Sequence, residues 1–447
     1  MSNRYIELVP TNVPSNGRIS FKNGHPVIQF LIGASDYLLL GSSVRLCGDF
    51  KCWLSTTPTV PKTSGGVNDV DRDQLNMDAR TGVYGAIDQL VIKNVGQFST
   101  IEHIKSYNRF MASYVPVTSA VSDVSGHFNE TALMSGNYGL QKETVVDGVT
   151  GDTAENGLNT NSFSVHLPCG LLLGQQPLFI GEQGLNGILL ELHLTPDSQF
   201  FHMADNNATT TSIQDAYYEF SNLKLTAELI QPDAGTLKTL TSKAGSTYQY
   251  NSISSYYTSI NSANAIVNFN LGLRNVLGVW ANFIEAERIN NWQYNGLETR
   301  WLHNADQSPA YLKTLIFTKG GQKFPDNYDL ETIQKTTPAN TFQDPSVIRG
   351  FMNAITQFSK QGRTMVSPNN TFQNSLDADN SWIDGGVIAG VGMAYDQVSG
   401  QGVDFSSQNF GIRMDCNLIS NVPTGLFLFV HSKQTLVFNG SGLQIIK

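Results

Sequence analysis

The sequence predicts a mainly β protein built from two β-sandwiches or barrels in tandem. Each half of the chain closes with segments in which apolar and polar side chains alternate strictly, the pattern of strands with one buried face. The clearest are 190–194 and 223–229 in the first half and 410–418 in the second. The length of 447 residues also exceeds the size at which a single core stops growing, so two units of roughly 200 residues are expected.

Further strands and one helix are predicted in the first half. The strand segments are rich in apolar and β-branched residues between Gly, Pro and Asn. They are Val27–Ile32, 44–50, Ile87–Asn94 and 163–167. Ser99 and Glu102 form a capping-box pattern, which predicts that a helix begins there. Its apolar positions at helical spacing would be Ile101, Ile104, Tyr107 and Met111.

The second half repeats this organisation. Its predicted strands are 265–271, 276–284 and 311–318. A helix is predicted to begin at Pro345, with Asp344 as its cap. Its apolar stripe, which we expect to pack on its own sandwich, consists of Val347, Ile348, Phe351, Met352, Ile355 and Phe358.

The strand pattern breaks after Ile230, where a short stretch contains Pro232 and Gly235. We therefore predict a first domain at residues 1–232 and a second at 233–447. Because no low-complexity tract separates the halves, the linker is short, and two domains at a fixed angle are expected.

Charge and hydropathy exclude several classes. With 28 Lys and Arg against 37 Asp and Glu, the net charge of −9 argues against direct nucleic-acid binding. Apolar runs such as 387–391 and 426–430 are too short to span a bilayer, and residues 1–10 lack the pattern of a signal peptide. We expect synthesis in the cytosol without secretion.

Cysteine usage agrees with a reducing compartment. The four thiols are Cys47, Cys52, Cys169 and Cys416. Cys47 and Cys52 are close enough for a bridge or half a zinc site, but no second pair with ligand spacing follows. Reduced thiols are therefore favoured.

Motifs for catalysis or metal binding are few. Asp69, Asp71 and Asp73 begin like a calcium loop, but Gln74 and Arg80 stand where Gly and Glu are required. A solvated acidic loop is favoured. The sequence shows no phosphate-binding loop, nucleophile elbow or zinc-protease motif. We predict no catalytic residue, no cofactor and no metal site.

Two alternative functions stay open. Glu285 and Glu287 could share one strand face in a glycan hydrolase built on two β-sandwiches, although paired catalytic carboxylates usually come from different strands. Trp292 and Trp301 could serve a lectin-like or receptor-binding spike, although buried aromatic anchors are the commoner use.

Three long polar connections stand out, at 56–81, 122–161 and 362–386. They are rich in Gly, Ser, Thr, Asn and Asp, with little periodicity. Loops of this length in a compact domain are usually functional or disordered. We favour ordered packing between copies of the chain.

Several stretches, in order along the chain, resemble the double jelly-roll major capsid proteins of polinton-like viruses, virophages, adenoviruses and large eukaryotic DNA viruses. They are GAIDQLVI (85–92), IEHI (101–104), YN (107–108), LPCGLL (167–172), GLNGI (184–188), GGQKFP (320–325), GVGMAYD (390–396) and GVDF (402–405). The likeness is greatest to the polinton-like and virophage branch.

This resemblance implies two tandem eight-stranded antiparallel jelly-roll barrels, each with a short inserted helix, and no enzymatic activity. It also implies a homotrimer, whose six barrels form a pseudo-hexagonal capsomer in an icosahedral shell. The implied partners are neighbouring capsomers and penton and minor or cement proteins, and the implied location is the virion.

Overall fold

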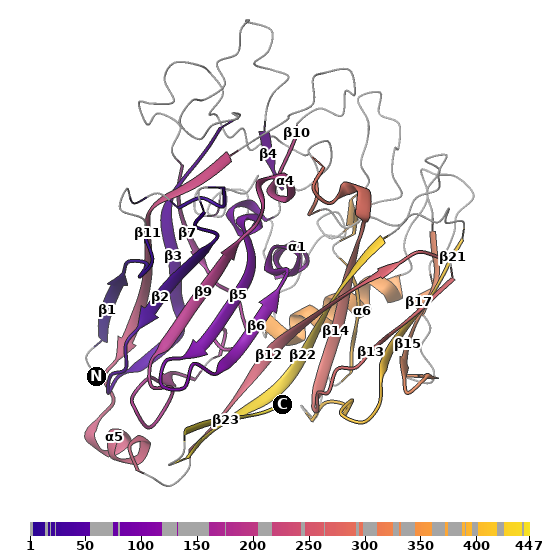
Figure 1. Cartoon of the computed structure of the whole chain (residues 1–447). Coiled ribbons are helices and arrows are strands. Elements are labelled where there is room, and N and C mark those ends of the chain that lie inside the picture. The colour runs from indigo at the N-terminus through magenta and orange to yellow at the C-terminus, as the bar shows by residue number, and fades with distance from the viewer. Residues whose placement is uncertain are drawn as a thin grey trace, which may run out of the picture.

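The computed structural model contains two pairs of antiparallel sheets, one pair from each half of the chain (Figure 1). The structure describes residues 3–53, 75–118, 161–203, 217–297, 311–324, 345–359, 387–395, 401–417 and 424–447, except for short gaps within them, and a few residues in between. Both termini lie toward the end of the molecule where α5 (Ala234–Leu240) and β23 (Gly442–Ile446) are found.

The first sandwich has the strand order of a jelly roll. One sheet runs β1 (Asn3–Leu8), β11 (Tyr217–Ile230), β3 (Leu38–Trp53), β7 (Asn161–His166), with β8 (Leu178–Phe179) also on β3. The other runs β2 (Val27–Ile32), β9 (Ile188–Leu194), β5 (Ile87–Asn94), β6 (Thr100–Lys105). Strands β4 (Leu75–Met77) and β10 (Phe201–Met203) pair separately. Apart from β8, eight strands are thus divided between two facing sheets, four in each.

The second sandwich repeats this order. One sheet runs β12 (Ser246–Ile260), β22 (Thr424–Asn439), β14 (Val276–Glu285), β20 (Val391–Ala394), with β23 beside β22. The other runs β13 (Asn264–Phe269), β21 (Phe410–Asn417), β15 (Tyr311–Lys319), β16 (Gln322–Lys323), with β17 (Leu330–Glu331) on β15. A separate pair joins β18 (Phe372–Gln373) and β19 (Val387–Ile388). The predicted duplication of a jelly roll is confirmed.

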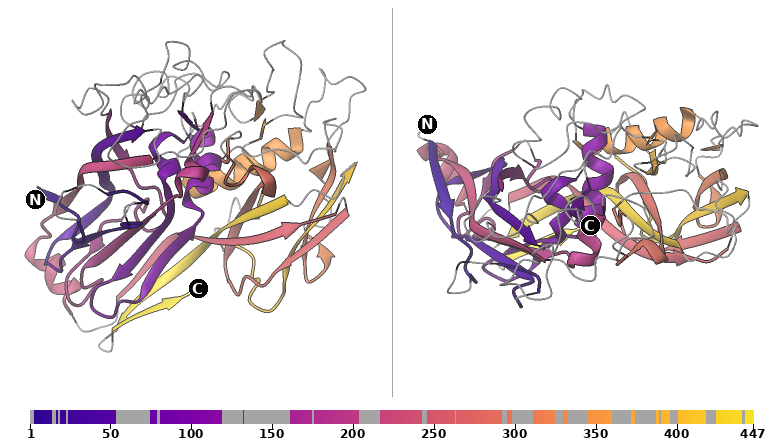
Figure 2. Two further views of the ribbon diagram at one scale, coloured as in Figure 1. Left: turned by 45° about the horizontal axis from the view of Figure 1, so that its top comes forward. Right: turned by 90° about the horizontal axis from the view of Figure 1, so that it is seen from above.

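Two helices occupy equivalent places in the repeat, each between the fifth and sixth jelly-roll strands. They are α1 (Tyr107–Thr118) and α6 (Pro345–Ser359). Viewed from above, α1 lies between the two sandwiches (Figure 2). Shorter helical segments are η1 (Gly82–Ala86), α4 (Asp197–Phe200), α5 and η4 (Ala286–Arg288). Helix α5 joins the halves, and its Asp233 cap accepts a hydrogen bond from the Thr236 amide at 2.9 Å.

The expected start of the first helix at Ser99 is wrong. Residues 100–105 form β6, and the helix begins only at Tyr107. The Ser99 amide instead donates to Asn94 Oδ1 at 2.8 Å, which closes the turn between β5 and β6. The second helix does begin at Pro345 as predicted, whereas its Asp344 cap lies outside the described residues.

Strand β22 departs from simple alternation, because every residue from Thr424 to Ser432 is buried. Leu426, Leu428 and Val430 face the core between the second pair of sheets. Phe427 and Phe429 on the opposite face join the hydrophobic cluster that also contains the core of the first half. The two halves therefore share a buried junction, and a division at residue 232 stays an interpretation.

A carboxylate is buried in the first half at the start of α4. Asp197 Oδ1 accepts from the Tyr218 amide at 3.1 Å, while Oδ2 has no partner among the described residues. Burial raises the pKa of Asp197 to about 6, and Lys22 only partly opposes it. The native state then binds more protons than the unfolded chain between about pH 4 and 6, so ionisation of Asp197 lowers stability as pH rises through this window.

We expect Asp197→Asn to flatten the fall in unfolding free energy between pH 4 and 6. The shift of about two pH units corresponds to at most about 3 kcal/mol gained at pH 7. Urea titrations at several pH values measure this slope. Asp233→Asn is the control, because hydrogen bonds from Thr236 lower the pKa of that exposed carboxylate. An unchanged slope in the Asp197 variant would contradict the assignment.

Candidate functional site

The candidate enzyme features do not come together. Glu285 ends β14, whereas Glu287 lies in η4, so the two do not share a strand face. Within the part of the chain that the structure describes, no group of three His, Cys, Asp or Glu residues could hold a metal ion. No helix in that part is long and apolar enough to cross a membrane.

Several predicted features lie outside the described residues. They are the three aspartates at 69–73, Trp292, Trp301 and most of the long polar connections. Cys47 is a free, half-buried thiol with Sγ 3.2 Å from Ser164 Oγ, and Cys169 is free and buried. The expectation of reduced thiols is confirmed for these two.

The most distinctive polar site joins the two sandwiches, and it centres on Glu102 of β6. This side chain is only 2% exposed. Glu102 Oε1 accepts from the amides of Gly170 (3.0 Å) and Ile253 (2.9 Å), and Oε2 accepts from the Leu171 amide (2.9 Å). Ile253 belongs to β12 of the second sandwich, so one carboxylate binds both halves. We call this group, Glu102 with Gly170, Leu171 and Ile253, the Glu102 clasp.

The electrostatics of the Glu102 clasp are those of a buried carboxylate that is closely hydrogen-bonded. Burial raises the pKa of Glu102, and the three amides with Cys169 oppose that rise by stabilising the charged form. Burial also raises the pKa of the Cys169 thiol, which stays protonated beside the carboxylate. The Glu102 clasp connects the two sandwiches and presents no reactive group to solvent.

Strand β12 lies beside the outer edge of β6 (Figure 1). Its side chains satisfy that edge. The Tyr250 hydroxyl donates to the Ile101 carbonyl at 3.0 Å. The Lys105 amide donates to Ser255 Oγ at 2.7 Å. An open strand edge can pair with other chains, so this cover removes a risk of aggregation while it fixes β12 on the first sandwich.

Helix α1 forms the other half of the junction. Asn282 Nδ2 of β14 donates to the Arg109 carbonyl and to Ser113 Oγ, both at 3.0 Å. The Arg109 guanidinium lies 4.3 Å from the centre of the Phe427 ring and donates to the Gly296 carbonyl at 2.6 Å. Burial lowers the pKa of Arg109 to about 10, so it remains charged at neutral pH. These contacts bind α1 to the second sandwich.

Aromatic rings fill the space between α1, α6 and the second sandwich. The Phe110 ring centre lies 6.1 Å from Trp280, 6.0 Å from Phe358 and 5.7 Å from Phe429. Tyr114 adds an edge-on contact to Phe358 at 6.0 Å. Aromatic pairs with offset or edge-on geometry stabilise beyond their buried area. The described part of the predicted apolar stripe of α6, which includes Phe358 but not Val347 and Ile348, therefore packs against its own sandwich and against α1 of the other half.

We expect Glu102→Gln to lower the unfolding free energy by about 2–3 kcal/mol. Glutamine keeps one acceptor oxygen, and its NH₂ group cannot accept from the remaining amide, which leaves a buried donor unsatisfied. The urea midpoint checks this value. Glu191→Gln is the matched control. Glu191 forms an ion pair with Lys93 that is partly solvated, and this pair is expected to contribute at most about 1 kcal/mol. Equal effects of the two substitutions would contradict the role of the clasp.

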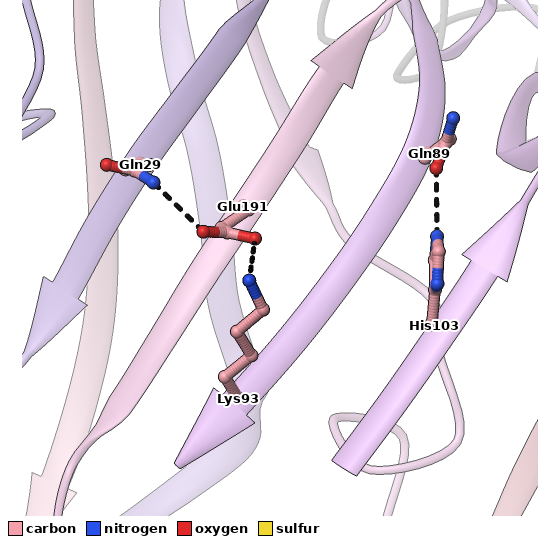
Figure 3. A network of polar contacts seen from close by, with 5 residues as sticks. All are labelled: Gln29, Gln89, Lys93, His103 and Glu191. Carbon is pink, nitrogen blue, oxygen red and sulfur yellow. Dashed lines mark hydrogen bonds and ion pairs between the residues drawn. The ribbon is translucent and has the colours of Figure 1, made fainter. Parts of the chain in front are cut away.

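Polar side chains lie together on one face of the sheet formed by β2, β9, β5 and β6 (Figure 3). Glu191 accepts from Gln29 Nε2 at 2.9 Å and from Lys93 Nζ at 2.6 Å. Burial alone would raise the pKa of Glu191, but these hydrogen bonds and the Lys93 charge hold it below its usual range. Nearby, His103 Nε2 lies 2.8 Å from Gln89 Oε1. Burial and Lys105 lower the pKa of His103, which is neutral at pH 7. These five polar side chains therefore satisfy one another.

Sequence reasoning missed the Glu102 clasp. Glu102 and Gly170 both lie in the stretches 101–104 and 167–172 that carry the resemblance, but no local signal connects them to Ile253. The 68-residue separation of Glu102 and Gly170 and the 151-residue separation of Glu102 and Ile253 are bridged only by the fold.

No known family model and no curated protein matches the sequence. Solved structures do match in fold. A chain of the Sputnik virophage structure aligns with a TM-score of 0.55 at 10% identity, over 100% of this chain and 88% of that one. A chain of the PBCV-1 virus capsid model aligns with a TM-score of 0.56 at 10% identity, over 100% and 96%.

The Faustovirus major capsid protein aligns with a TM-score of 0.55 at 8% identity, over 98% of this chain and 90% of that one. The chain thus has the double jelly-roll fold of viral major capsid proteins, as the resemblance in its sequence led us to expect. The likeness covers both sandwiches in each case.

Proposed function

We propose, from the premise of this shared double jelly roll, that the chain is the major capsid protein of an icosahedral DNA virus. The observation that carries the proposal is coverage. The whole chain is matched, and it spans 88% of the chain from the Sputnik virophage and 96% of the chain from the PBCV-1 virus capsid. The role proposed is structural, with no catalysis.

We further propose that three copies form one capsomer. Each chain contains two similar barrels. A threefold axis that relates three chains therefore gives six barrels in a ring, which has a pseudo-hexagonal outline. This packing needs the two barrels at a fixed angle, and the buried junction with its Glu102 clasp supports such an arrangement. A heterologous contact that closes after three copies gives a discrete particle.

If capsomers form a closed shell, each must also contact other proteins of the shell. Capsomers of this kind would contact neighbouring capsomers through polar surfaces such as that of Glu191, Gln29 and Lys93, and penton and cement proteins would fill the vertices and seams. We propose that the end bearing both termini faces the inside of the shell. The net charge of −9 disfavours direct binding of the packaged nucleic acid.

Native mass tests the proposal. We expect a mass of about 147 kDa, three times 48.9 kDa, by light scattering across a dilution series. Images of the particle should show six lobes. A chain that stays monomeric at all concentrations in low and high salt would contradict the trimer. A trimer with three lobes or an elongated spike would contradict the capsomer.

A further inference from the structure

A cavity opens where the first sandwich changes its strand pairing. On one edge of β3, Leu38 and Leu39 pair with β8, whereas residues 45–50 pair with β7. Between these two ladders, residues 40–44 have no strand partner on that edge among the described residues. A cavity of about 190 Å³ lies at this gap, beside α1.

The walls of the cavity are mostly apolar. Helix α1 contributes Met111, Tyr114 and Val115, and the segment after β7 contributes Leu167 and Leu172. Several polar side chains complete the lining.

Two of the polar side chains at the cavity form hydrogen bonds. His166 Nε2 lies 3.0 Å from Arg45 Nη1, and the Thr118 hydroxyl donates to the Tyr114 carbonyl at 2.9 Å. Tyr84 is only 4% exposed and lines the cavity, yet its hydroxyl makes no hydrogen bond with any residue that the structure describes. A buried phenol normally finds an acceptor. Because burial raises the pKa of Tyr84, the hydroxyl remains a donor at neutral pH.

We propose that this cavity binds a small uncharged aromatic molecule that carries one hydrogen-bond acceptor. A cavity of about 150 Å³ accepts benzene, so this one has room for a single ring with a small substituent. The acceptor would receive the hydrogen bond that Tyr84 does not make. A charged ligand is disfavoured, since the nearby Arg45 already donates to Ser164 and His166 and burying an unpaired charge is costly.

Because of where the cavity lies, a bound ligand would affect the junction between the two sandwiches. Leu172 and Leu167 flank the residues Gly170 and Leu171, whose amides hold the carboxylate of Glu102. A ligand that fills the space between this segment and α1 would stabilise both components of the junction. This inference does not depend on a capsid role.

Acetophenone and α-methylstyrene make a matched pair of probes, because they share shape while only the first has a carbonyl acceptor. We expect saturable binding of acetophenone to the full chain by ligand-observed NMR, with a rise in the thermal midpoint. One hydrogen bond predicts about five- to tenfold weaker binding of α-methylstyrene. Absence of saturable binding of either probe would overturn the proposal.

Variants locate the site. Tyr84→Phe removes only the hydroxyl and should make the two affinities equal. Tyr256→Phe is the control, because that hydroxyl donates to the Leu271 carbonyl in the second sandwich and should leave the preference intact. Val115→Phe should fill the cavity and abolish binding of both probes. If Val115→Phe does not fold, Tyr84→Phe still decides. A preference that survives Tyr84→Phe, or probe binding that survives in a folded Val115→Phe, would place the ligand elsewhere and refute the assignment.

Discussion

Replacing Gly170 by alanine is expected to destabilise the protein by about 3 kcal/mol or more and to loosen the two sandwiches from each other. An added Cβ would overlap the carbonyl oxygen of Asn251 and lie 2.5 Å from its carbonyl carbon and 2.7 Å from Ser252 Cα. These are backbone atoms of β12, which pairs with β22 along its whole length and cannot easily move. Overpacking against fixed atoms costs about 1–3 kcal/mol, and displacement of the Gly170 amide would also weaken the Glu102 clasp.

Urea unfolding and native mass measure the effect of Gly170→Ala. Gly33→Ala is the matched control, because a Cβ at that position meets no atom within 4 Å and the backbone needs no positive φ. We expect the control to stay within about 0.5 kcal/mol of the parent. If Gly170→Ala behaved like the control, β12 would not lie against this turn in solution.

The strands could be predicted from sequence because their signal is local. The alternation and the flanking turn residues place Val27–Ile32 and Ile87–Asn94 at their observed bounds. The capping-box pattern at Ser99 failed for the opposite reason. Glu102 stands three residues after Ser99, as in a capping box, but its carboxylate accepts hydrogen bonds from the amides of two remote segments. These tertiary hydrogen bonds outweigh the weak local preference for a helix.

The junction could not be predicted from sequence. The apolar run 426–430 indicates a buried segment, yet the sequence does not say that its second face packs on another sandwich. The same holds for Trp280 and Phe358, which suit an ordinary core and instead meet Phe110 of the first half. Such contacts depend on how two domains are placed, and no residue pattern within one strand or helix encodes that placement.

Truncation of Phe429 is expected to test the junction most directly. Phe429→Ala removes a fully buried ring that packs 5.7 Å from Phe110 and 6.2 Å from Trp280, ring centre to ring centre. Large-to-small substitutions of this kind cost about 3–5 kcal/mol, because the surroundings relax only partly around the cavity. The lost free energy should come mainly from the contacts between the two sandwiches. We expect faster amide hydrogen exchange in α1 and α6, measured by mass spectrometry.

Leu428→Ala is the neighbour that separates a junction effect from a general one. Leu428 is equally buried but points into the core of the second sandwich. Its truncation should also cost about 2–5 kcal/mol, while faster exchange appears in β13 and β21 instead of α1. One residue along β22 thus divides the two cores, since successive side chains of a strand point to opposite faces. Identical exchange maps for the two variants would mean that the sandwiches open as a single unit, and the junction would then be no weaker than the cores that it joins.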